Sequence, residues 1–340
     1  MSETYYKTRE QNSYRLLQEV LNRLPDFGKS FINSKNYTLA VQTRLGYARD
    51  LEMFFYFVTK TNPLMSGKKP RDVTFAILES LTPQDIDEYM AFLESYEYEG
   101  KTYSNSSSGK RRKLASVREL YKHLCKYGSI RQNPALLVDT PKDSLKKSIR
   151  ALNGEEKRSI LASIDNKDAK NNNINIRDRA IIMLFLGTGI RVSELVGLNL
   201  DDVNMKYHFI TVISKGGKYQ HHYFNEEVFN CLTAYNDIRL NFHPVHDEGA
   251  LFLSKQGKRL CVRSVELMVK KYSSIALGNK DAISPHKLRS TYGTDLYAMT
   301  GDIALVSDNL GHADISTTKK YYAKQNLDNL KRNKDFKIFE

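Results

Sequence analysis

Two short segments in the second half of the sequence place a permanent cation beside a group that can move a proton or fix that cation. In G-I-R-V-S-E-L, Arg191 directly follows a glycine turn and Glu194 lies one helical turn later on the same side. In S-P-H-K-L-R, His286 and Arg289 share one helix face at a spacing of three residues. Alone, the first pair could also be a surface ion pair, and the second could be a solvated helix end. Together, they favour chemistry at an anionic oxygen.

A third segment, L-G-H-A-D-I-S-T-T-K-K-Y-Y, adds a histidine and two adjacent tyrosines. A glycine turn brings His312 into a bend between two expected helices, and Tyr321 and Tyr322 follow on the second of them. One tyrosine can pack its ring and keep its hydroxyl in water, which leaves the other hydroxyl for chemistry. A phenol has a pKa of about 10. Attack on phosphorus by its oxygen therefore requires surrounding positive charge and hydrogen-bond donors, which two arginines would supply.

The positive charge of the chain is concentrated in one region. The 340 residues carry a formal net charge of +13, and residues 101–150 hold thirteen Lys or Arg against three acidic residues, a local charge of +10. Clustered cations release counterions from a phosphate backbone and give salt-dependent affinity. We therefore expect a nucleic acid as partner rather than a solvated basic face. A membrane surface is disfavoured, because no strong Trp or Phe stripe lies opposite the charges.

Other features argue against a membrane protein, a disulfide-stabilised protein and a metalloprotein. The longest apolar run, residues 180–187, is too short to cross a bilayer, and the start of the chain lacks the apolar part of a signal peptide, so we expect a soluble cytoplasmic protein. Three isolated cysteines give neither a disulfide framework nor a CxxC knuckle. The histidines at 221, 222, 243 and 246 lack nearby ligands, so we expect no metal and place them on the surface of a strand and a loop.

The N-terminal part of the sequence has the pattern of a small all-helical domain. Apolar spacing predicts a leading helix within residues 1–30 and an amphipathic helix over 38–59. Thr82 and Pro83 form a typical helix start. A basic helix follows, with an expected inward face of Leu114, Val117, Leu120, Tyr121 and Leu124. The cations expected to contact the nucleic acid are Arg44, Lys110, Arg111, Arg112 and Lys113.

A charged segment over residues 138–151 is expected to link this domain, residues 31–137, to a second one over 152–325. In the second domain, two helices meet at Gly187-Thr-Gly189, and the β-like runs 207–214 and 219–224 flank a glycine turn, which predicts a hairpin. Helices are expected at roughly 225–240, 262–276, 285–299, 302–310, 314–325 and 326–335. The fold class is therefore mainly α, with two domains and a small antiparallel sheet in the second.

These motifs, in this order, resemble those of the tyrosine recombinase (phage integrase) family of site-specific DNA recombinases. They cover most of residues 152–325, and the basic helical region is similar to the family's core-binding, SAM-like domain. The resemblance implies that Tyr321 attacks DNA and becomes linked to a 3′ phosphate, while Arg191 and Arg289 hold the nonbridging oxygens. His286 and His312 would donate hydrogen bonds or move protons. No metal or nucleotide cofactor is implied, because the phosphotyrosine keeps the bond energy.

The resemblance also assigns supporting roles and exposes departures from the family pattern. Lys215 would protonate the departing 5′ hydroxyl, and Glu194 would support Arg191. The common G-K-G appears here as S-K-G-G-K, so Lys218 remains a second candidate for the general acid. Tyr322 points about 100° away from Tyr321 and is interpreted as a packing residue. Ser290 stands where many members have a second histidine.

Several functions share this chemistry. The resemblance is greatest to the Xer type, which resolves chromosome dimers, and the alternative is an integrase or excisionase of a mobile element. More remote alternatives are a type IB topoisomerase-like enzyme and a DNA-binding protein without catalysis. The last residues, 326–340, carry apolar side chains without an obvious place in their own domain. They are expected to dock in trans within a homotetramer on paired DNA sites, and a septal DNA translocase is a possible further partner.

Overall fold

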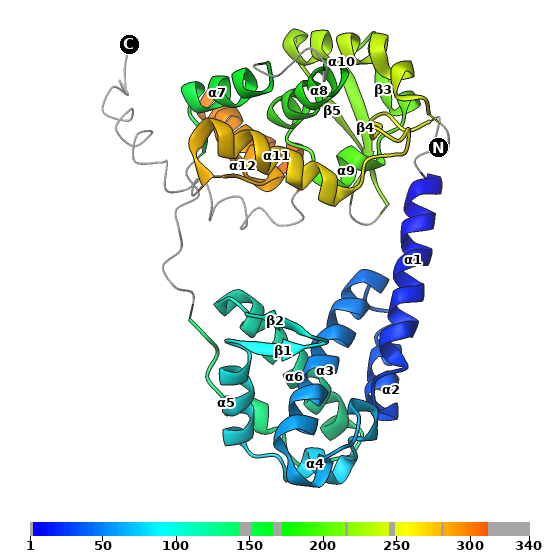
Figure 1. Ribbon diagram of the computed structural model, residues 1–340, viewed down its shortest axis with the longest axis vertical. Helices are drawn as coiled ribbons and strands as arrows, with labels where there is room; N and C mark the ends of the chain where they lie inside the picture. Colours follow the sequence, from blue (N-terminus) through cyan, green and yellow to red (C-terminus); the bar gives the residue numbers. More distant parts are fainter. Residues whose placement is uncertain are drawn as a thin grey trace, which may run out of the picture. The chain divides into compact units, whose positions relative to one another are not determined.

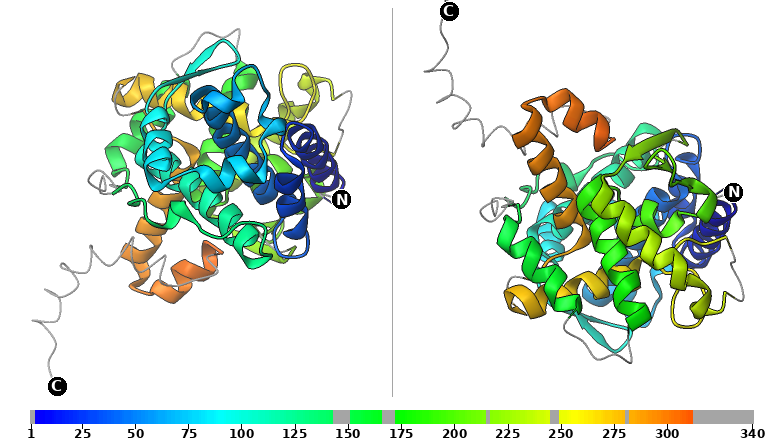
Figure 2. Two further views of the ribbon diagram at one scale, coloured as in Figure 1. Left: turned by 90° about the horizontal axis from the view of Figure 1, so that it is seen from below. Right: turned by 90° about the horizontal axis from the view of Figure 1, so that it is seen from above.

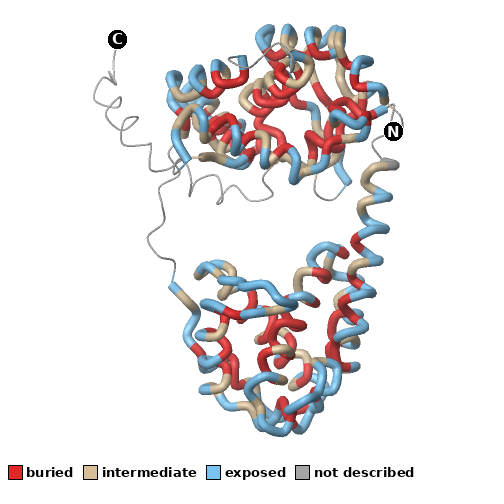
Figure 3. Tube along the Cα trace, viewed as in Figure 1, coloured by how far each residue is buried: buried red, intermediate tan, exposed pale blue. Residues whose placement is uncertain are grey.

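The chain forms two units, each with its own hydrophobic core (Figures 1 and 3). The computed structural model describes residues 3–142, 151–165, 172–214, 217–244, 249–279 and 282–311. One unit comprises Tyr6–Lys147, and the other comprises Ser148–Glu340 together with Met1–Tyr5. The expected fold class, a mainly α chain of two domains with a small antiparallel sheet, is confirmed.

The N-terminal unit is a set of helices arranged around one long helix, α3. Its elements are α1 (Glu3–Leu21), α2 (Asp26–Ser34), α3 (Val41–Thr61), η1 (Pro63–Met65), η2 (Pro70–Asp72), α4 (Phe75–Ser80), α5 (Pro83–Phe92), β1 (Tyr96–Tyr98), β2 (Lys101–Tyr103), α6 (Ser107–Lys126) and η3 (Pro134–Leu136). Helix α3 packs against α2, α5 and α6. Its fully buried rings Phe54 and Phe55 lie in the aromatic core, with Phe54 edge-on to Tyr89 of α5 at 5.2 Å between ring centroids.

The helix starts and buried faces of this unit follow the sequence pattern. Thr82 caps α5 through its hydroxyl, and Asp85 bonds back to the Thr82 backbone at 2.7 Å, so the predicted start is confirmed. The predicted inward face of α6 is also confirmed, since all five of its apolar residues, Leu114, Val117, Leu120, Tyr121 and Leu124, are buried.

The prediction that this unit is all-helical is wrong in one place. Strands β1 and β2 form an antiparallel hairpin in which Tyr96 pairs with Tyr103. Glu99 and Gly100 connect them, and both have positive φ angles, 50° and 72°. A two-residue loop with two positive φ angles matches the right-handed twist of the strands it joins. The glycine and the aromatic alternation around it were the available signals for this hairpin.

The C-terminal unit is built around helix α8. Its elements are α7 (Gly154–Asp165), α8 (Asn172–Thr188), α9 (Val192–Gly197), η5 (Leu200–Asp202), β3 (Val203–Asn204), β4 (Phe209–Ile213), β5 (Tyr219–Tyr223), α10 (Glu226–Ile238), η6 (Arg239–Phe242), α11 (Val262–Leu277), α12 (Pro285–Thr300) and α13 (Ile303–Asn309). Helices α10 and α12 pack on α8, while α7 packs on α11 (Figures 1 and 2). Helix α8 is buried because its neighbours cover it on more than one side.

The sheet of this unit has the order β3-β4-β5 and is antiparallel throughout. The predicted hairpin is confirmed, with Val212 opposite Gln220 and Ile213 opposite Tyr219. The short strand β3 was not predicted. Because side chains alternate along a strand, Gln220 and His222 lie on one face of β5 and Tyr219, His221 and Tyr223 on the other.

Helices α10, α11, α12 and α13 confirm four of the predicted helical segments to within a few residues. The two further helices predicted at 314–325 and 326–335 lie outside the described residues. Within the part of the chain that is described, no helix is both long and apolar enough to cross a membrane.

Candidate active site

A tight turn between α8 and α9 positions the first arginine. Gly189 has φ of +63°, a left-handed conformation that glycine adopts without strain, and its N–H donates to the Phe185 carbonyl at 2.9 Å. The chain then re-enters helix at Arg191, the N-cap residue of α9. The turn therefore places Arg191 between the end of α8 and the start of α9.

Glu194 fixes Arg191 through both its main chain and its side chain. One carboxylate oxygen accepts from the Arg191 backbone N–H at 2.7 Å, and the other accepts from Arg191 Nη1 at 2.8 Å. The Glu194 side chain is 4% exposed, whereas that of Arg191 is 34% exposed. Because both oxygens of this buried carboxylate bond to Arg191, Glu194 fixes the orientation of that arginine. The two residues are therefore not the surface ion pair that their spacing also allowed.

Helix α12 supplies the second arginine and the histidine. Pro285 takes its first position, as predicted, although the Ser284 side chain makes no capping hydrogen bond. Arg289 is buried, and its Nη1 donates to the Gly189 carbonyl at 2.6 Å. The second arginine therefore ties α12 to the same glycine turn that positions the first.

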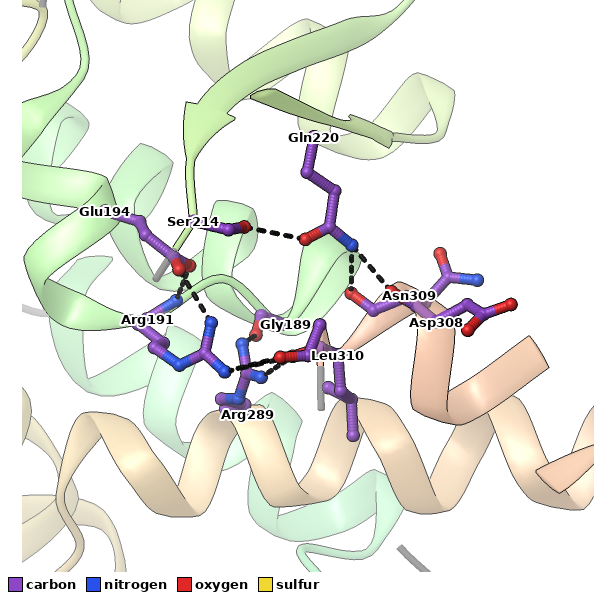
Figure 4. A network of polar contacts seen from close by, with 10 residues as sticks. Gly189, Arg191, Glu194, Ser214, Gln220, Arg289, Asp308, Asn309 and Leu310 are labelled. Atoms are coloured by element: carbon purple, nitrogen blue, oxygen red, sulfur yellow. Dashed lines mark hydrogen bonds and ion pairs between the residues drawn. The ribbon is translucent and has the colours of Figure 1, made fainter. Parts of the chain in front are cut away.

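Both guanidinium groups meet at the end of α13. Arg289 Nη2 donates to the Leu310 carbonyl, and Arg191 Nη2 donates to the carbonyls of Leu310 and Gly311 at 3.3 and 2.9 Å (Figure 4). Two permanent cations therefore converge on the carbonyl oxygen of Leu310. His312 follows two residues later in the sequence. The two guanidinium groups are therefore close enough together that an anion beside the Leu310 carbonyl could be held by charge-assisted hydrogen bonds from both.

His286 lies one helical turn before Arg289, and its environment favours the neutral form of the imidazole. Partial burial of the imidazole lowers the pKa of His286, and the positive charges of Arg289 and Arg191 lower it further. A neutral imidazole offers one donor and one acceptor nitrogen, so it can hydrogen-bond to an oxygen or accept a proton.

His222 corrects the surface assignment made from the sequence. It is 2% exposed on the inner face of β5, and neither ring nitrogen has a hydrogen bond of normal geometry among the described residues. Burial lowers the pKa of His222 to about 4, with Arg289 and Arg191 acting in the same direction against Glu194 and the Thr188 backbone. His222 is therefore a neutral group packed near both arginines.

The remaining predicted catalytic residues, Lys215, His312 and Tyr321, lie outside the described residues, as does Tyr322. Lys218 is described and is exposed at the end of the hairpin turn. No group of three or more His, Cys, Asp or Glu side chains within the described ranges is placed to hold a metal ion. That the reaction needs no metal or cofactor stays a prediction.

The cations predicted to contact nucleic acid differ in accessibility. Asp50 of α3 is 1% exposed and forms ion pairs with Arg112 and with Lys113, the latter at 3.3 Å. Lys113 is itself buried, and burial lowers its pKa despite the pull of Asp50. The prediction of a nucleic-acid contact by Lys113 is therefore corrected, because its ammonium is committed to a buried carboxylate. The spacing of the cations could not reveal a partner on another helix.

The other four predicted cations are placed differently from Lys113. Lys110 pairs with Glu94 at 2.7 Å, Arg111 is half-buried, and Arg112 is exposed although it reaches Asp50. Arg44 is buried on α3, and its Nε makes no hydrogen bond within the described chain. A buried cation without a hydrogen bond on its Nε is costly unless an anion completes it.

Comparison with known proteins shows which family the chain resembles. The phage integrase family matches residues 150–327. The tyrosine recombinase XerC of Caldanaerobacter subterraneus subsp. tengcongensis is 36% identical over 299 residues, which cover 84% of this chain and 80% of that protein. XerC of Pelobacter propionicus is 30% identical over 310 residues, or 90% of this chain and 91% of the relative.

Solved structures agree in fold. The XerH recombinase bound to palindromic difH in a post-cleavage complex has a TM-score of 0.64 at 21% identity, covering 94% of this chain and 88% of that one. A lambda integrase dimer bound to a COC′ core site has a TM-score of 0.61 at 15% identity, covering 86% and 93%. The fold, the paired arginines and the relatives define a tyrosine site-specific recombinase of the Xer type. The chain belongs to the phage integrase family.

Proposed function

We propose that this recombinase cleaves and rejoins double-stranded DNA through a covalent 3′-phosphotyrosine at Tyr321. The observation that carries the proposal is the convergence of Arg191 and Arg289 on one oxygen position. A scissile phosphate beside the Leu310 carbonyl would lie close to both guanidinium groups, which could each hold one of its nonbridging oxygens. As the Tyr321 oxygen bonds to phosphorus, the bond to the 5′ oxygen breaks, and the arginines stabilise the charge that develops.

The other residues have roles that follow from this geometry. Glu194 keeps the Arg191 fork aimed at the phosphate, and neutral His286 hydrogen-bonds a phosphate oxygen or takes up a proton. His312, which directly follows Gly311 in the chain, is the second histidine of the site. Lys215 gives the 5′ oxygen its proton, with Lys218 as the alternative general acid.

Binding of DNA is proposed to involve both units. Residues 31–137 act as the core-binding domain and contact phosphates through Lys110, Arg111 and Arg112. Arg44 stays a predicted contact, although it is buried on α3. Residues 152–325 act as the catalytic domain. The structures of relatives such as XerH and lambda integrase on their DNA sites support this partner.

The assembly is proposed to be a homotetramer on paired recombination sites, with residues 326–340 docking on a neighbouring protomer. The proposed role is resolution of chromosome dimers in the cytoplasm, which the likeness to XerC recombinases over 84% and 90% of this chain supports. A septal DNA translocase is proposed as a possible further partner. Excision or integration of a mobile element uses the same reaction and differs only in the DNA site.

Covalent trapping tests the proposal and identifies the site. Wild type, Tyr321→Phe and Tyr322→Phe are incubated without metal with nicked suicide fragments of the genome that encodes the chain, and SDS-resistant adducts are collected. Adducts that are lost only with Tyr321→Phe are expected, and sequencing the attached DNA shows whether the site is chromosomal or lies at the end of a mobile element. Loss of adducts only with Tyr322→Phe would show that Tyr322, not Tyr321, is the nucleophile. The absence of any adduct from wild type across the whole genome would contradict catalysis.

A further inference from the structure

Gln220 joins two parts of the C-terminal unit that are far apart in the sequence. Its Oε1 accepts from the Ser214 hydroxyl at 2.9 Å, at the end of β4. Its Nε2 donates to the Asp308 carbonyl at 2.6 Å and to the Asn309 carbonyl at 3.4 Å, at the end of α13 (Figure 4). One amide therefore connects the catalytic hairpin to the segment on which both arginines converge.

The fit around this amide is close. Gly311 has φ of +54°, and a Cβ atom added to it would lie 2.7 Å from Gln220 Oε1 and 3.7 Å from Arg191 Nη1. Gly311 thus lies between Gln220 and the first arginine, and a Cβ at this position would require the Gln220 amide to shift.

On its other side, Gln220 is hydrogen-bonded to Ser214 at the start of the hairpin turn. The Ser214 N–H donates to the Lys218 carbonyl at 2.8 Å, and its carbonyl accepts from Gly217 at 3.0 Å, so Ser214 closes the turn at both ends. Lys215 is the next residue in the chain, and Lys218 is the residue that ends the turn. Both candidate general acids therefore depend on where Ser214 is held.

We propose that Gln220 is a positioning residue that aligns the general-acid lysine with the phosphate held by the arginines. The inference rests on the proposed function. A glutamine suits this role because one planar group both accepts from a hydroxyl and donates to carbonyls, which neither a carboxylate nor an ammonium can do. Without it, the hairpin and the end of α13 lose their direct side-chain link.

The step that depends on this alignment is departure of the 5′ oxygen. When the bond from phosphorus to that oxygen breaks, the oxygen takes a proton from the general acid. A substrate with sulfur in place of the bridging 5′ oxygen releases a thiolate. A thiol with a pKa of about 8.5 is a far stronger acid than an alcohol, so its thiolate leaves without a proton from a general acid. Such a substrate removes the need for the lysine and leaves the need for the arginines.

The test measures single-turnover cleavage of the ordinary and the sulfur-bridged substrate by wild type, Gln220→Ala, Gln220→Glu and the control His221→Ala. His221 lies on the opposite face of the same strand and bonds to Thr211 across the hairpin. The ordinary substrate is expected to be cleaved roughly 10- to 100-fold more slowly by both Gln220 variants, the scale of a 1 Å misplacement. The sulfur-bridged substrate is expected to be cleaved within about threefold of wild type.

The ratio of the two rates is taken within one preparation, so partial unfolding of a variant cancels. An equal slowing on both substrates, or no slowing on the ordinary one, would overturn the positioning role. A changed ratio for His221→Ala would also overturn it, because the effect would then belong to the strand as a whole. Failure of wild-type protein to form an adduct at Tyr321 would instead contradict the proposed function, and that result is scored separately.

Discussion

Replacing Gly189 by alanine should damage the active site through one clash that the structure locates. A Cβ at this position would lie 2.3 Å from Cδ1 of Tyr292, 2.9 Å from Cγ and 3.0 Å from Cε1, in a residue whose φ is +63°. The left-handed backbone costs a non-glycine residue about 1–2 kcal/mol, and overpacking a ring costs about 1–3 kcal/mol more. We expect Gly189→Ala to lower the stability of the C-terminal unit by about 2–5 kcal/mol.

Gly301 provides the matched control. Its φ is +67°, but no atom lies within 4 Å of an added Cβ. Gly301→Ala should therefore cost only the backbone part, about 1–2 kcal/mol. Hydrogen exchange of the α8 and α12 amides, followed by mass spectrometry, reports on this unit alone and avoids assuming one transition for both units.

A double-variant cycle isolates the clash. In a Tyr292→Ala background the ring is gone, so Gly189→Ala should cost about 1–3 kcal/mol less than in wild type. Cleavage should fall as well, because the turn that must move carries the carbonyl that holds Arg289. Equal loss of protection in Gly189→Ala and Gly301→Ala, with no coupling to Tyr292, would refute the reasoning.

Three further outcomes are expected. Arg289→Ala should slow single-turnover cleavage at least about a hundredfold while gel-shift affinity for DNA stays nearly unchanged; equal losses in both would indicate a binding role. The pKa of His222 is about 4 in the folded state, and that of an unfolded histidine is about 6.5. As the pH falls, the unfolded chain therefore binds this proton at a higher pH than the folded chain does. Stability should fall from about pH 6.5 to pH 4 by about 3 kcal/mol more in wild type than in His222→Gln, as measured by urea unfolding, and parallel curves would contradict this. Deletion after Asn326 should reduce synapsis on native gels more than binding to a single site, and undiminished recombination would remove the trans-docking role.

Much of the fold could be predicted from local patterns, because those patterns reflect local physics. The proline start of α12 and the glycine break before Arg191 depend on backbone geometry within a few residues, and both are seen in the structure. The hairpin of β4 and β5 followed in the same way from its turn glycines. The arginine pair could be proposed from residue type, although its meeting point at Leu310 could not.

The failures have a common cause in contacts between distant segments. Lys113 was predicted to face DNA because its neighbours are basic, yet the partner that buries it, Asp50, is on another helix. His222 was assigned to the surface, although strand alternation leaves open which face packs inward and only the tertiary structure decides. Gln220 carried no signal, because a single glutamine acquires a role only when two carbonyls from residues about ninety positions away meet its amide.

Most of the acceptors at the meeting point of the arginines belong to the main chain. Arg191, Arg289 and Gln220 all donate to peptide carbonyls of residues 308–311. Alanine scanning through these four positions would leave every one of those carbonyl acceptors in place. A mutational map would therefore show the segment as tolerant, except where the absence of a side chain matters, as at Gly311. Replacing single peptide bonds by esters, which weakens the carbonyl as an acceptor without changing the side chain, is the perturbation that would reveal them. Natural variation in this contact must therefore arise at the three donors.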